Sequence, residues 1–193
     1  MGIEFELKFR ATPEQQAAIR QQTSGEEQQY VMATTYYDTP SGAMSARKYT
    51  LRQRMENEQS VCTLKTPAEG YGRREFEVNS PSIDEAIPEL CKLSGIPELP
   101  GLLQEGIVPV CGAAFTRIAK TVELKNCTVE LAFDTGILTG GGKEIPLCEI
   151  EVELKDGDQA AAVAFAKQLS LAYGLIPEHR SKFVRAQALA KGE

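Results

Sequence analysis

Charged residues alternate with apolar residues in several short segments of this chain. The first segment carries charge at Glu4, Glu6 and Lys8, and a later segment, 149–155, repeats the pattern. Successive side chains of a β-strand point to opposite faces of the sheet, so each segment predicts a strand with one charged and one apolar face. Like charges on one face repel each other. Such a face is therefore stable only where water solvates it or where it holds cations.

The simpler interpretation is that each charged face is the solvated side of an amphipathic sheet. Two observations favour another. Solvent-facing strands usually mix Ser, Thr, Asn and Gln with charge, whereas these faces hold almost only Glu, Lys and Arg. The opposite faces are apolar enough to pack against the predicted helices. We therefore expect the charged faces to line the inside of a closed or nearly closed sheet, which can enclose a single ligand.

Charged faces that point inward would bind a metal–polyphosphate complex, with carboxylates holding the metal and cationic side chains holding the phosphates. Carboxylate oxygens suit the hard cations Mg²⁺ and Mn²⁺, of which one or two are expected. The candidate metal ligands are Glu4, Glu6, Asp134, Glu149, Glu151 and Glu153. Guanidinium and ammonium groups suit phosphate oxygens. The candidate phosphate ligands are Lys8, Arg52, Arg54, Lys65, Arg73 and Arg117.

Composition limits the other classes of function. The 193 residues are 42% hydrophobic and 25% charged, which predicts one folded domain over residues 1–193. The net charge of −6 argues against a general nucleic-acid binder. No apolar run is long enough to span a membrane, and no signal peptide precedes the first strand. The single histidine, His179, excludes a multi-histidine zinc site and is expected at the surface. Five cysteines without metal-type spacing indicate thiols in a reducing cytoplasm.

The elements that must position these side chains predict an α+β domain. Helix start signals at Thr12 and Ser82 predict helices over about 12–22 and 82–94. Apolar spacing predicts a third helix over about 158–173, and a short helix follows His179. The charged segments between these helices predict antiparallel strands at 3–10, 30–38, 50–56, 61–66, 73–79, 115–124, 128–134 and 149–155. The Pro-rich stretch ending at Pro109 is expected to be a connection within the domain.

The charged segments also carry a family resemblance. Residues 4–8, EFELK, match the ExExK signature of the CYTH superfamily, the triphosphate tunnel metalloenzymes. Further motifs that resemble this family follow in order along nearly the whole chain: TYYDTP at 35–40, LRQR at 51–54, TLK at 63–65, RREFE at 73–77, FTR at 115–117, FD at 133–134, CEIEVEL at 148–154 and RSKF at 180–183. A lone ExExK would be a weak signal, but the ordered set is specific.

The resemblance implies a closed antiparallel β-barrel of about eight strands that forms a tunnel, with helices packed outside. It implies Mg²⁺- or Mn²⁺-dependent hydrolysis of triphosphates. By position, the glutamates of 4–6 and 149–151 resemble the family's metal ligands, with Asp134 or Glu153 completing the set. The residues that resemble its phosphate cradle are Lys8, Arg52, Arg54, Lys65, Arg117 and Lys182. Either Glu75 or Glu77 suits the family's mid-chain acidic position. Lys120 departs from the family pattern, which leaves its role open.

The expected activity is hydrolysis of the terminal phosphoanhydride of inorganic tripolyphosphate. In that reaction Lys8, Arg52, Arg54, Lys65 and Arg117 are the catalytic candidates, and Arg73, Glu75 and Lys182 join them in binding the substrate. A thiamine triphosphatase and a class IV-type adenylate cyclase of the same family are the alternative enzymes. A non-catalytic binder of polyphosphate or nucleotides is the alternative outside enzymes, although so many carboxylates argue against it unless they hold metal. The sequence does not fix the oligomeric state, and a homodimer remains open.

Overall fold

The computed structural model describes residues 2–68 and 72–192. These residues form strands and helices in the following order: β1 (Gly2–Glu4), β2 (Glu6–Arg10), α1 (Pro13–Gln22), β3 (Glu27–Asp38), α2 (Ala43–Ala46), β4 (Thr50–Glu56), β5 (Gln59–Pro67), β6 (Arg73–Asn79), α3 (Ile83–Ser94), α4 (Leu99–Leu102), the 3₁₀ turn η1 (Leu103–Glu105), β7 (Val108–Glu123), β8 (Cys127–Gly140), β9 (Lys143–Gly157), α5 (Gln159–Tyr173), β10 (Ile176–Pro177) and α6 (Lys182–Lys191). Among the helices of the described residues, none is long and apolar enough to cross a membrane.

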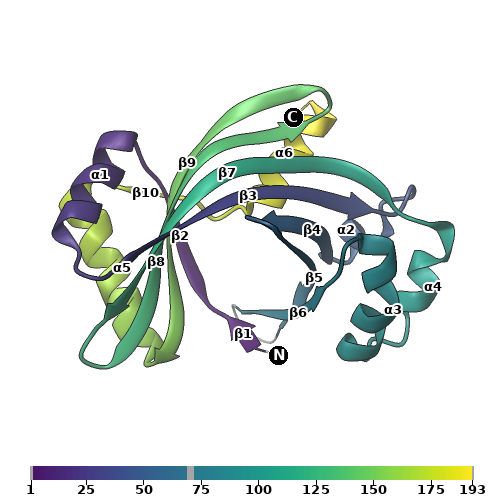
Figure 1. Ribbon diagram of the computed structural model, residues 1–193, viewed down its shortest axis with the longest axis horizontal. Coiled ribbons are helices and arrows are strands. Elements are labelled where there is room, and N and C mark those ends of the chain that lie inside the picture. The colour runs from purple at the N-terminus through teal and green to yellow at the C-terminus, as the bar shows by residue number, and fades with distance from the viewer. Residues whose placement is uncertain (1, 69–71, 193) are drawn as a thin grey trace.

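All the strands belong to one antiparallel sheet that curves around a central opening (Figure 1). Its hydrogen-bonded order is β1-β6-β5-β4-β3-β7-β8-β9-β2-β10. The strands β1 and β2 are separated only by Phe5, yet β1 pairs with β6 while β2 pairs with β9. The predicted α+β class with an antiparallel sheet is confirmed.

The sheet differs from the expectation of a closed barrel of about eight strands. The described residues form ten strands, because the first predicted strand breaks at Phe5 and a two-residue β10 adds to the edge of β2. The hydrogen-bonded order is linear and does not form a complete ring among the described residues. The main chain at Phe5 links β1, which pairs with β6 on one side of the sheet, to β2, which pairs with β9 on the other side.

Helices cover the outer face of the sheet at its two ends. At one end α1 and α5 lie against β2, β8 and β9, and bury a core that includes Ile19, Ala166 and Ile150. At the other end α3 and α4 cover β4, β5 and β6, around Leu51 and Leu90. The apolar positions of the alternating strands thus face the helices, which leaves their charged positions on the inner face.

The C-terminal helix α6 does not follow the expectation that helices pack outside. Its Phe183 ring lies 5.2 Å from the ring of Tyr36, centroid to centroid. Tyr36 pairs directly with Arg52 of the neighbouring strand, and paired residues share one face of a sheet. Helix α6 therefore packs on the inner face, in a third core with Met32 and Phe115. This packing brings Lys182 to the charged interior.

Candidate active site

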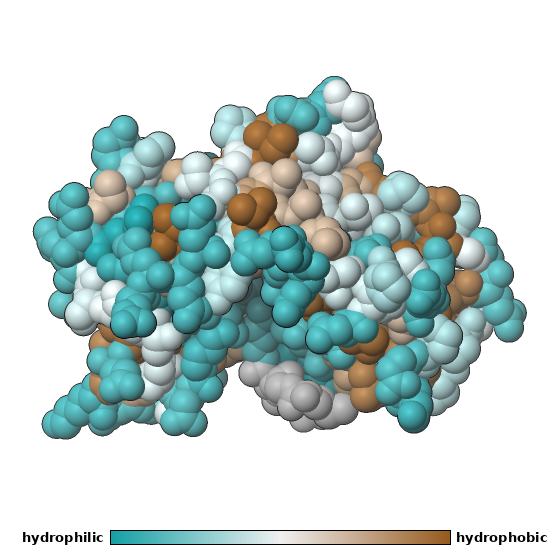
Figure 2. Space-filling model, viewed as in Figure 1, coloured by the Kyte–Doolittle hydropathy of each residue, from teal (hydrophilic) through white to brown (hydrophobic). Residues whose placement is uncertain are grey.

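The inner face of the sheet surrounds a cavity of about 1330 Å³. Figure 2 shows it as a hydrophilic hollow between the α1/α5 end and the α3/α4 end of the molecule. Acidic and basic side chains from β1, β2, β4, β5, β6, β7 and β9 line it, together with the start of α6. The alternation predicted from the sequence thus brings residues far apart in the chain into one charged space.

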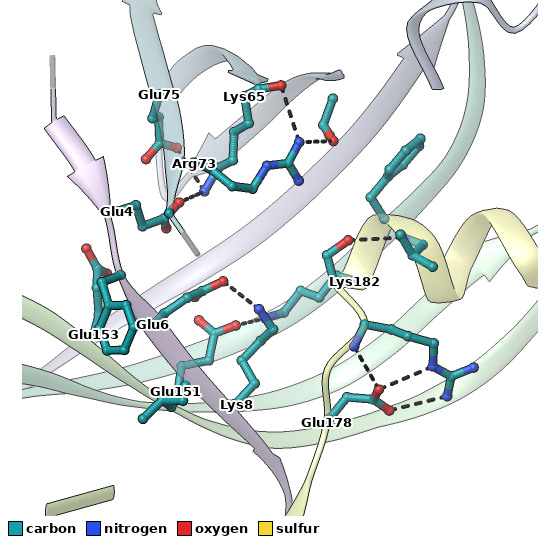
Figure 3. A pocket seen from close by; sticks show the side chains of 18 of the residues that line it. Glu4, Glu6, Lys8, Lys65, Arg73, Glu75, Glu151, Glu153, Glu178 and Lys182 are labelled. Atoms are coloured by element: carbon teal, nitrogen blue, oxygen red, sulfur yellow. Dashed lines mark hydrogen bonds and ion pairs between the residues drawn. The ribbon is translucent and has the colours of Figure 1, made fainter. Parts of the chain in front are cut away.

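One side of the cavity is acidic. Glu4 and Glu6 project from the N-terminal strands toward the space that Glu153 and Lys8 also face (Figure 3). Glu6 lies directly opposite Glu153 in the β2–β9 register, and Lys8 lies opposite Glu151. We call Glu4, Glu6 and Glu153, with Lys8 among them, the acidic wall.

Lysines balance part of the charge of the acidic wall. The Lys8 ammonium lies 2.5 Å from a Glu6 carboxylate oxygen, and the Lys65 ammonium lies 2.5 Å from Glu4. Burial would lower the pKa of Lys8, but Glu6 and Glu151 outweigh it and raise that pKa. Burial raises the pKa of Glu153 and the nearby Glu4 adds to the effect, although an ion pair with Lys155 at 2.9 Å opposes it. The raised pKa of Glu153 indicates a carboxylate that a cation would stabilise.

The facing side of the cavity is basic. We call Arg52, Arg54, Lys65 and Arg73 the basic wall. Lys65 also lies 3.0 Å from Glu75, and Arg52 lies 3.3 Å from the same carboxylate. Arg73 donates to the main-chain oxygen of Lys48 and to that of Lys65, at 2.8 and 3.3 Å. These contacts fix the side chains of the wall across β4, β5 and β6.

Two arginines of the basic wall are poorly balanced by carboxylates. Arg52 and Arg54 are each 8% exposed, and the Nε of Arg52 has no hydrogen-bond partner among the described residues. Arg54 donates to Thr34 at 3.2 Å, and its closest carboxylate contact, with Glu56, is 3.4 Å. Burial lowers the pKa of Arg54, and the neighbouring Arg52 lowers it further. A buried donor without a partner beside a second guanidinium is a site suited to an anion.

Beneath the acidic wall lies a second group of charges, which we call the buried cluster: Asp134, Glu149, Glu151, Arg117, Lys182 and Arg185. The Lys182 ammonium contacts Asp134 at 2.7 Å and Glu151 at 2.9 Å, and it also pairs with Glu149. Arg117 forms a two-pronged contact with Asp134, 2.8 Å for each pair of atoms, and also pairs with Glu151. Arg185 pairs with Glu149.

The buried cluster shifts the pKa values of several of its members. Burial would raise the pKa of Glu151, but Lys182 and Arg117 outweigh it and hold the pKa well below 4.5. Burial would lower the pKa of Lys182, but the three carboxylates raise it well above its usual range. Glu151 and Lys182 therefore stay charged across the ordinary pH range, whereas burial raises the pKa of Glu149.

The carboxylates of Asp134, Glu149 and Glu151 come within 4.8 Å of one another, which is close enough to hold one metal ion. Protein cations already pair with all three. Asp134 and Glu149 are fully buried and do not line the cavity, whereas Glu4, Glu6, Glu151 and Glu153 do. The four lining carboxylates offer oxygen donors of the type that Mg²⁺ and Mn²⁺ prefer, so this donor set fits such an ion.

The structure brings most of the predicted site residues into the cavity. The predicted phosphate-binding residues that line it are Lys8, Arg52, Arg54, Lys65, Arg73, Arg117 and Lys182. Glu75 and Glu77 line it together, and Glu75 is the one that pairs with both Arg52 and Lys65. His179 is exposed at the rim.

Sequence reasoning did not find Arg185, which pairs with Glu149 inside the buried cluster. The sequence did contain a signal for it, because Arg185 follows Lys182 by three positions and so lies on the same side of a helix.

Lys120 has a different role from the residues of the cavity. It donates to the main-chain oxygens of Arg20 and Thr23 at 2.7 and 2.9 Å, which caps the C-terminal end of α1.

Comparison with known proteins identifies the family. The sequence model of the CYTH domain matches residues 2–186. This chain belongs to the CYTH family. The CYTH chain is 31% identical to an inorganic triphosphatase of Haemophilus influenzae, over 96% of its own length and 54% of that relative. It therefore spans about half the length of the curated relative.

Solved structures show the same fold at lower identity. A protein of Pyrococcus horikoshii is 23% identical, with a TM-score of 0.64, over 98% of this CYTH chain and 99% of that one. A Hippeastrum protein described as a putative adenylyl cyclase with a dominant triphosphatase activity is 18% identical, with a TM-score of 0.68, over 100% of this chain and 97% of that one. At these identities the likeness is one of fold.

Proposed function

We propose that this CYTH chain hydrolyses the terminal phosphoanhydride of inorganic tripolyphosphate with the help of Mg²⁺ or Mn²⁺. The observation that carries the proposal is the pair Arg52 and Arg54. Both guanidiniums are buried against the cavity, and the Nε of Arg52 has no partner among the described residues. A phosphate chain would supply the missing acceptors. The relative from Haemophilus influenzae, named an inorganic triphosphatase, supports this choice.

The roles of the cavity residues follow from their positions. Arg52, Arg54, Lys65 and Arg73 bind phosphate oxygens along one side, and Arg117 and Lys182 bind from the floor. A planar guanidinium can hold two phosphate oxygens at once, which fixes the substrate as well as attracting it. Glu75 orients Arg52 and Lys65 through its contacts with both. These cations stabilise the charge that spreads over the transferred phosphoryl group.

The acidic wall would hold the metal together with Glu151, the one carboxylate of the buried cluster that lines the cavity. Glu4, Glu6, Glu151 and Glu153 would coordinate one or two ions, which supply charge neutralisation and acidify water when bound. Lys8 lies between Glu6 and Glu151 and faces the same space. In the proposed reaction its ammonium orients the attacking water or lowers the pKa of that water. Asp134 and Glu149 remain in the proposal as residues that hold the cations of the floor, rather than as direct metal ligands.

The chain is proposed to act as a single domain over residues 1–193, whose sheet closes into a tunnel around the substrate. The position of β1 and β2 supports closure, since these consecutive strands pair with β6 and β9. The location in the cytoplasm and the number of subunits stay predictions from the sequence.

Inorganic tripolyphosphate is favoured over nucleotides and thiamine triphosphate because most of the cavity's lining is charged. Of the five described aromatic residues that line the cavity, Phe9, Tyr36 and Phe183 are at most 6% exposed and pack in hydrophobic cores, so they offer no platform on which a base could stack. Phe5 and Tyr30 are partly exposed. The charged lining, in contrast, suits a ligand that is charged along its whole length.

The test measures released phosphate from tripolyphosphate, thiamine triphosphate and ATP with Mg²⁺ or Mn²⁺, together with formation of cyclic AMP. We expect the highest kcat/KM on tripolyphosphate, no cyclic AMP, and loss of turnover after chelation with EDTA. Higher kcat/KM on ATP with cyclic AMP as product would establish the cyclase instead. Binding of tripolyphosphate without any turnover would establish a non-catalytic binder.

A further inference from the structure

Arg185 is a largely buried arginine of α6, with 9% of its side chain exposed. Among the described residues it pairs with a single carboxylate. It pairs with the Oε2 of Glu149, and its Nε has no hydrogen-bond partner among the described residues. The other oxygen of Glu149, Oε1, pairs with the Lys182 ammonium. Glu149 itself is fully buried. The carboxylate of Glu149 thus bridges two cations of one helix.

Helix α6 places both cations rigidly. Ser181 caps its first turn, so Lys182 is the first helical residue and Arg185 lies on the same side three positions later. Phe183 and Ala186 anchor the helix in the third core. Lys182 faces the cavity floor, whereas Arg185 does not line the cavity.

The charges of the buried cluster balance only when Arg185 is counted. Its carboxylates are Asp134, Glu149 and Glu151, and its cations are Arg117, Lys182 and Arg185. Without Arg185, three carboxylates would share two cations away from water. A buried carboxylate that loses its partner draws the remaining cations toward itself. The ammonium of Lys182 is the nearest of these to Glu149.

We propose that Arg185 is a positioning residue for Lys182. By neutralising Glu149 from behind, it leaves the Lys182 ammonium centred among three carboxylates at the cavity floor, where it can contact a phosphate oxygen. Arg185 also keeps Glu149 occupied, which removes this carboxylate from competition for the metal. The role in phosphate binding rests on the proposed function, whereas the placement of the ammonium does not.

The experiment compares Arg185→Met with the rescue variant Arg185→Lys and with Lys191→Met, a control that removes an exposed charge from the same helix. Lysine-selective ¹⁵N NMR of the metal-free protein measures the placement of the Lys182 ammonium, assigned with Lys182→Met. Steady-state kinetics with tripolyphosphate measures KM and kcat. Thermal unfolding shows whether each variant is folded.

We expect the NMR signal of the Lys182 ammonium in the native chain, in Lys191→Met and in Arg185→Lys, and its shift or loss in Arg185→Met. We expect KM to rise about tenfold in Arg185→Met, on the scale of a weakened charge-assisted hydrogen bond, with kcat changed less. Arg185→Lys should restore most of the KM. An unchanged ammonium signal and KM in folded Arg185→Met would overturn the proposal.

A second comparison keeps the test decisive if Arg185→Met does not fold. The double variant Glu149→Gln/Arg185→Met retains equal numbers of cations and carboxylates in the cluster. If Arg185 acts through Glu149, the double variant should have the ammonium signal and the KM of Glu149→Gln alone. A further change on adding Arg185→Met to Glu149→Gln would overturn the proposal. Failure of the native chain to hydrolyse tripolyphosphate would instead refute the proposed function, while the NMR comparison still decides the role of Arg185.

Discussion

The acidic wall and the buried cluster are made of the same residue types, yet they treat charge in opposite ways. In the wall, Glu6 and Glu153 lie opposite each other and line the cavity, and each pairs with one lysine, Lys8 at 2.5 Å and Lys155 at 2.9 Å. In the cluster, Asp134 and Glu149 are fully buried, and each is held by two cations. The wall carboxylates thus face the cavity with one lysine partner each, whereas Asp134 and Glu149 share more cations and do not reach the cavity. Burial and pairing, rather than residue type, therefore separate a binding surface from its scaffold.

The largest expected effect is a difference between the two regions in how much a substitution lowers the free energy of unfolding. Asp134→Ala leaves Arg117 and Lys182 without their buried partner, so we expect the free energy of unfolding to fall by about 3–5 kcal/mol. The matched change in the wall, Glu153→Ala, removes a carboxylate that pairs with the exposed Lys155 and has Glu4 and Glu130 as like-charged neighbours, so it should cost less than about 1 kcal/mol. Urea unfolding at pH 7 measures both. Equal losses would mean that the wall is as tightly integrated as the cluster.

The next effect is on catalysis. Arg52→Ala should lower kcat/KM for tripolyphosphate about 100-fold or more, because it removes a donor that stabilises the transferred charge. The thermal midpoint should change little, since Arg52 leaves a donor unsatisfied in the free protein. The assay is phosphate release at saturating Mg²⁺ or Mn²⁺. An unchanged kcat/KM would place Arg52 outside the path of the substrate.

Metal binding should depend on the wall more than on the cluster. Glu4→Gln removes a lining carboxylate, and we expect the affinity for Mn²⁺ to fall at least about tenfold. Glu149→Gln should leave this affinity within about threefold, a difference of less than 1 kcal/mol, because Glu149 pairs with Arg185 and Lys182 instead. Titration of free Mn²⁺ by electron paramagnetic resonance measures both constants. The reverse order would identify the cluster as the metal site.

The dependence of stability on pH should reveal the cluster. The folded pKa of Glu151 lies well below 4.5, so its stabilising contribution is fully present above that pH and is lost as the pH falls toward the folded pKa. The difference in unfolding free energy between the native chain and Glu151→Gln should therefore shrink by up to about 1.4 kcal/mol for each pH unit below 4.5. Urea unfolding between pH 3 and pH 7 measures it. A constant difference would contradict the shifted pKa.

The smallest effect uses a cation outside both regions. Lys120 shares β7 with Arg117 but caps α1. Lys120→Met should lower the free energy of unfolding by about 1–2 kcal/mol, through loss of charged hydrogen bonds. We expect kcat/KM to stay within about twofold, or less than 0.5 kcal/mol. A large loss of activity with intact folding would connect Lys120 to the site.

Period-two alternation predicted much of this architecture, because it is a local property of each strand. It placed Lys8 and Arg52 on one interior face, and cap signals located α1 and α3 well. It could not locate the inner helix α6, since a helix with an apolar side packs equally well against either face of a sheet. The division of the carboxylates was also beyond the sequence. Glu149 and Glu153 look alike in the pattern, and only the position of α6 gives one of them two cations.

The break at Phe5 has a consequence for how the two sides of the curved sheet are held together. The main chain of Phe5 accepts a hydrogen bond from Leu154, which ties the break to β9, whereas β1 is joined to β6 by a ladder of only three residue pairs. Glu4 belongs to β1, with its short ladder to β6, whereas Glu6 belongs to β2, which pairs with β9 over five residues. A metal ion bound by both glutamates would link β1 to β2 and so stabilise the weakly paired β1. Ligand occupancy should then slow amide hydrogen exchange in β1 more than in the long hairpin of β8 and β9.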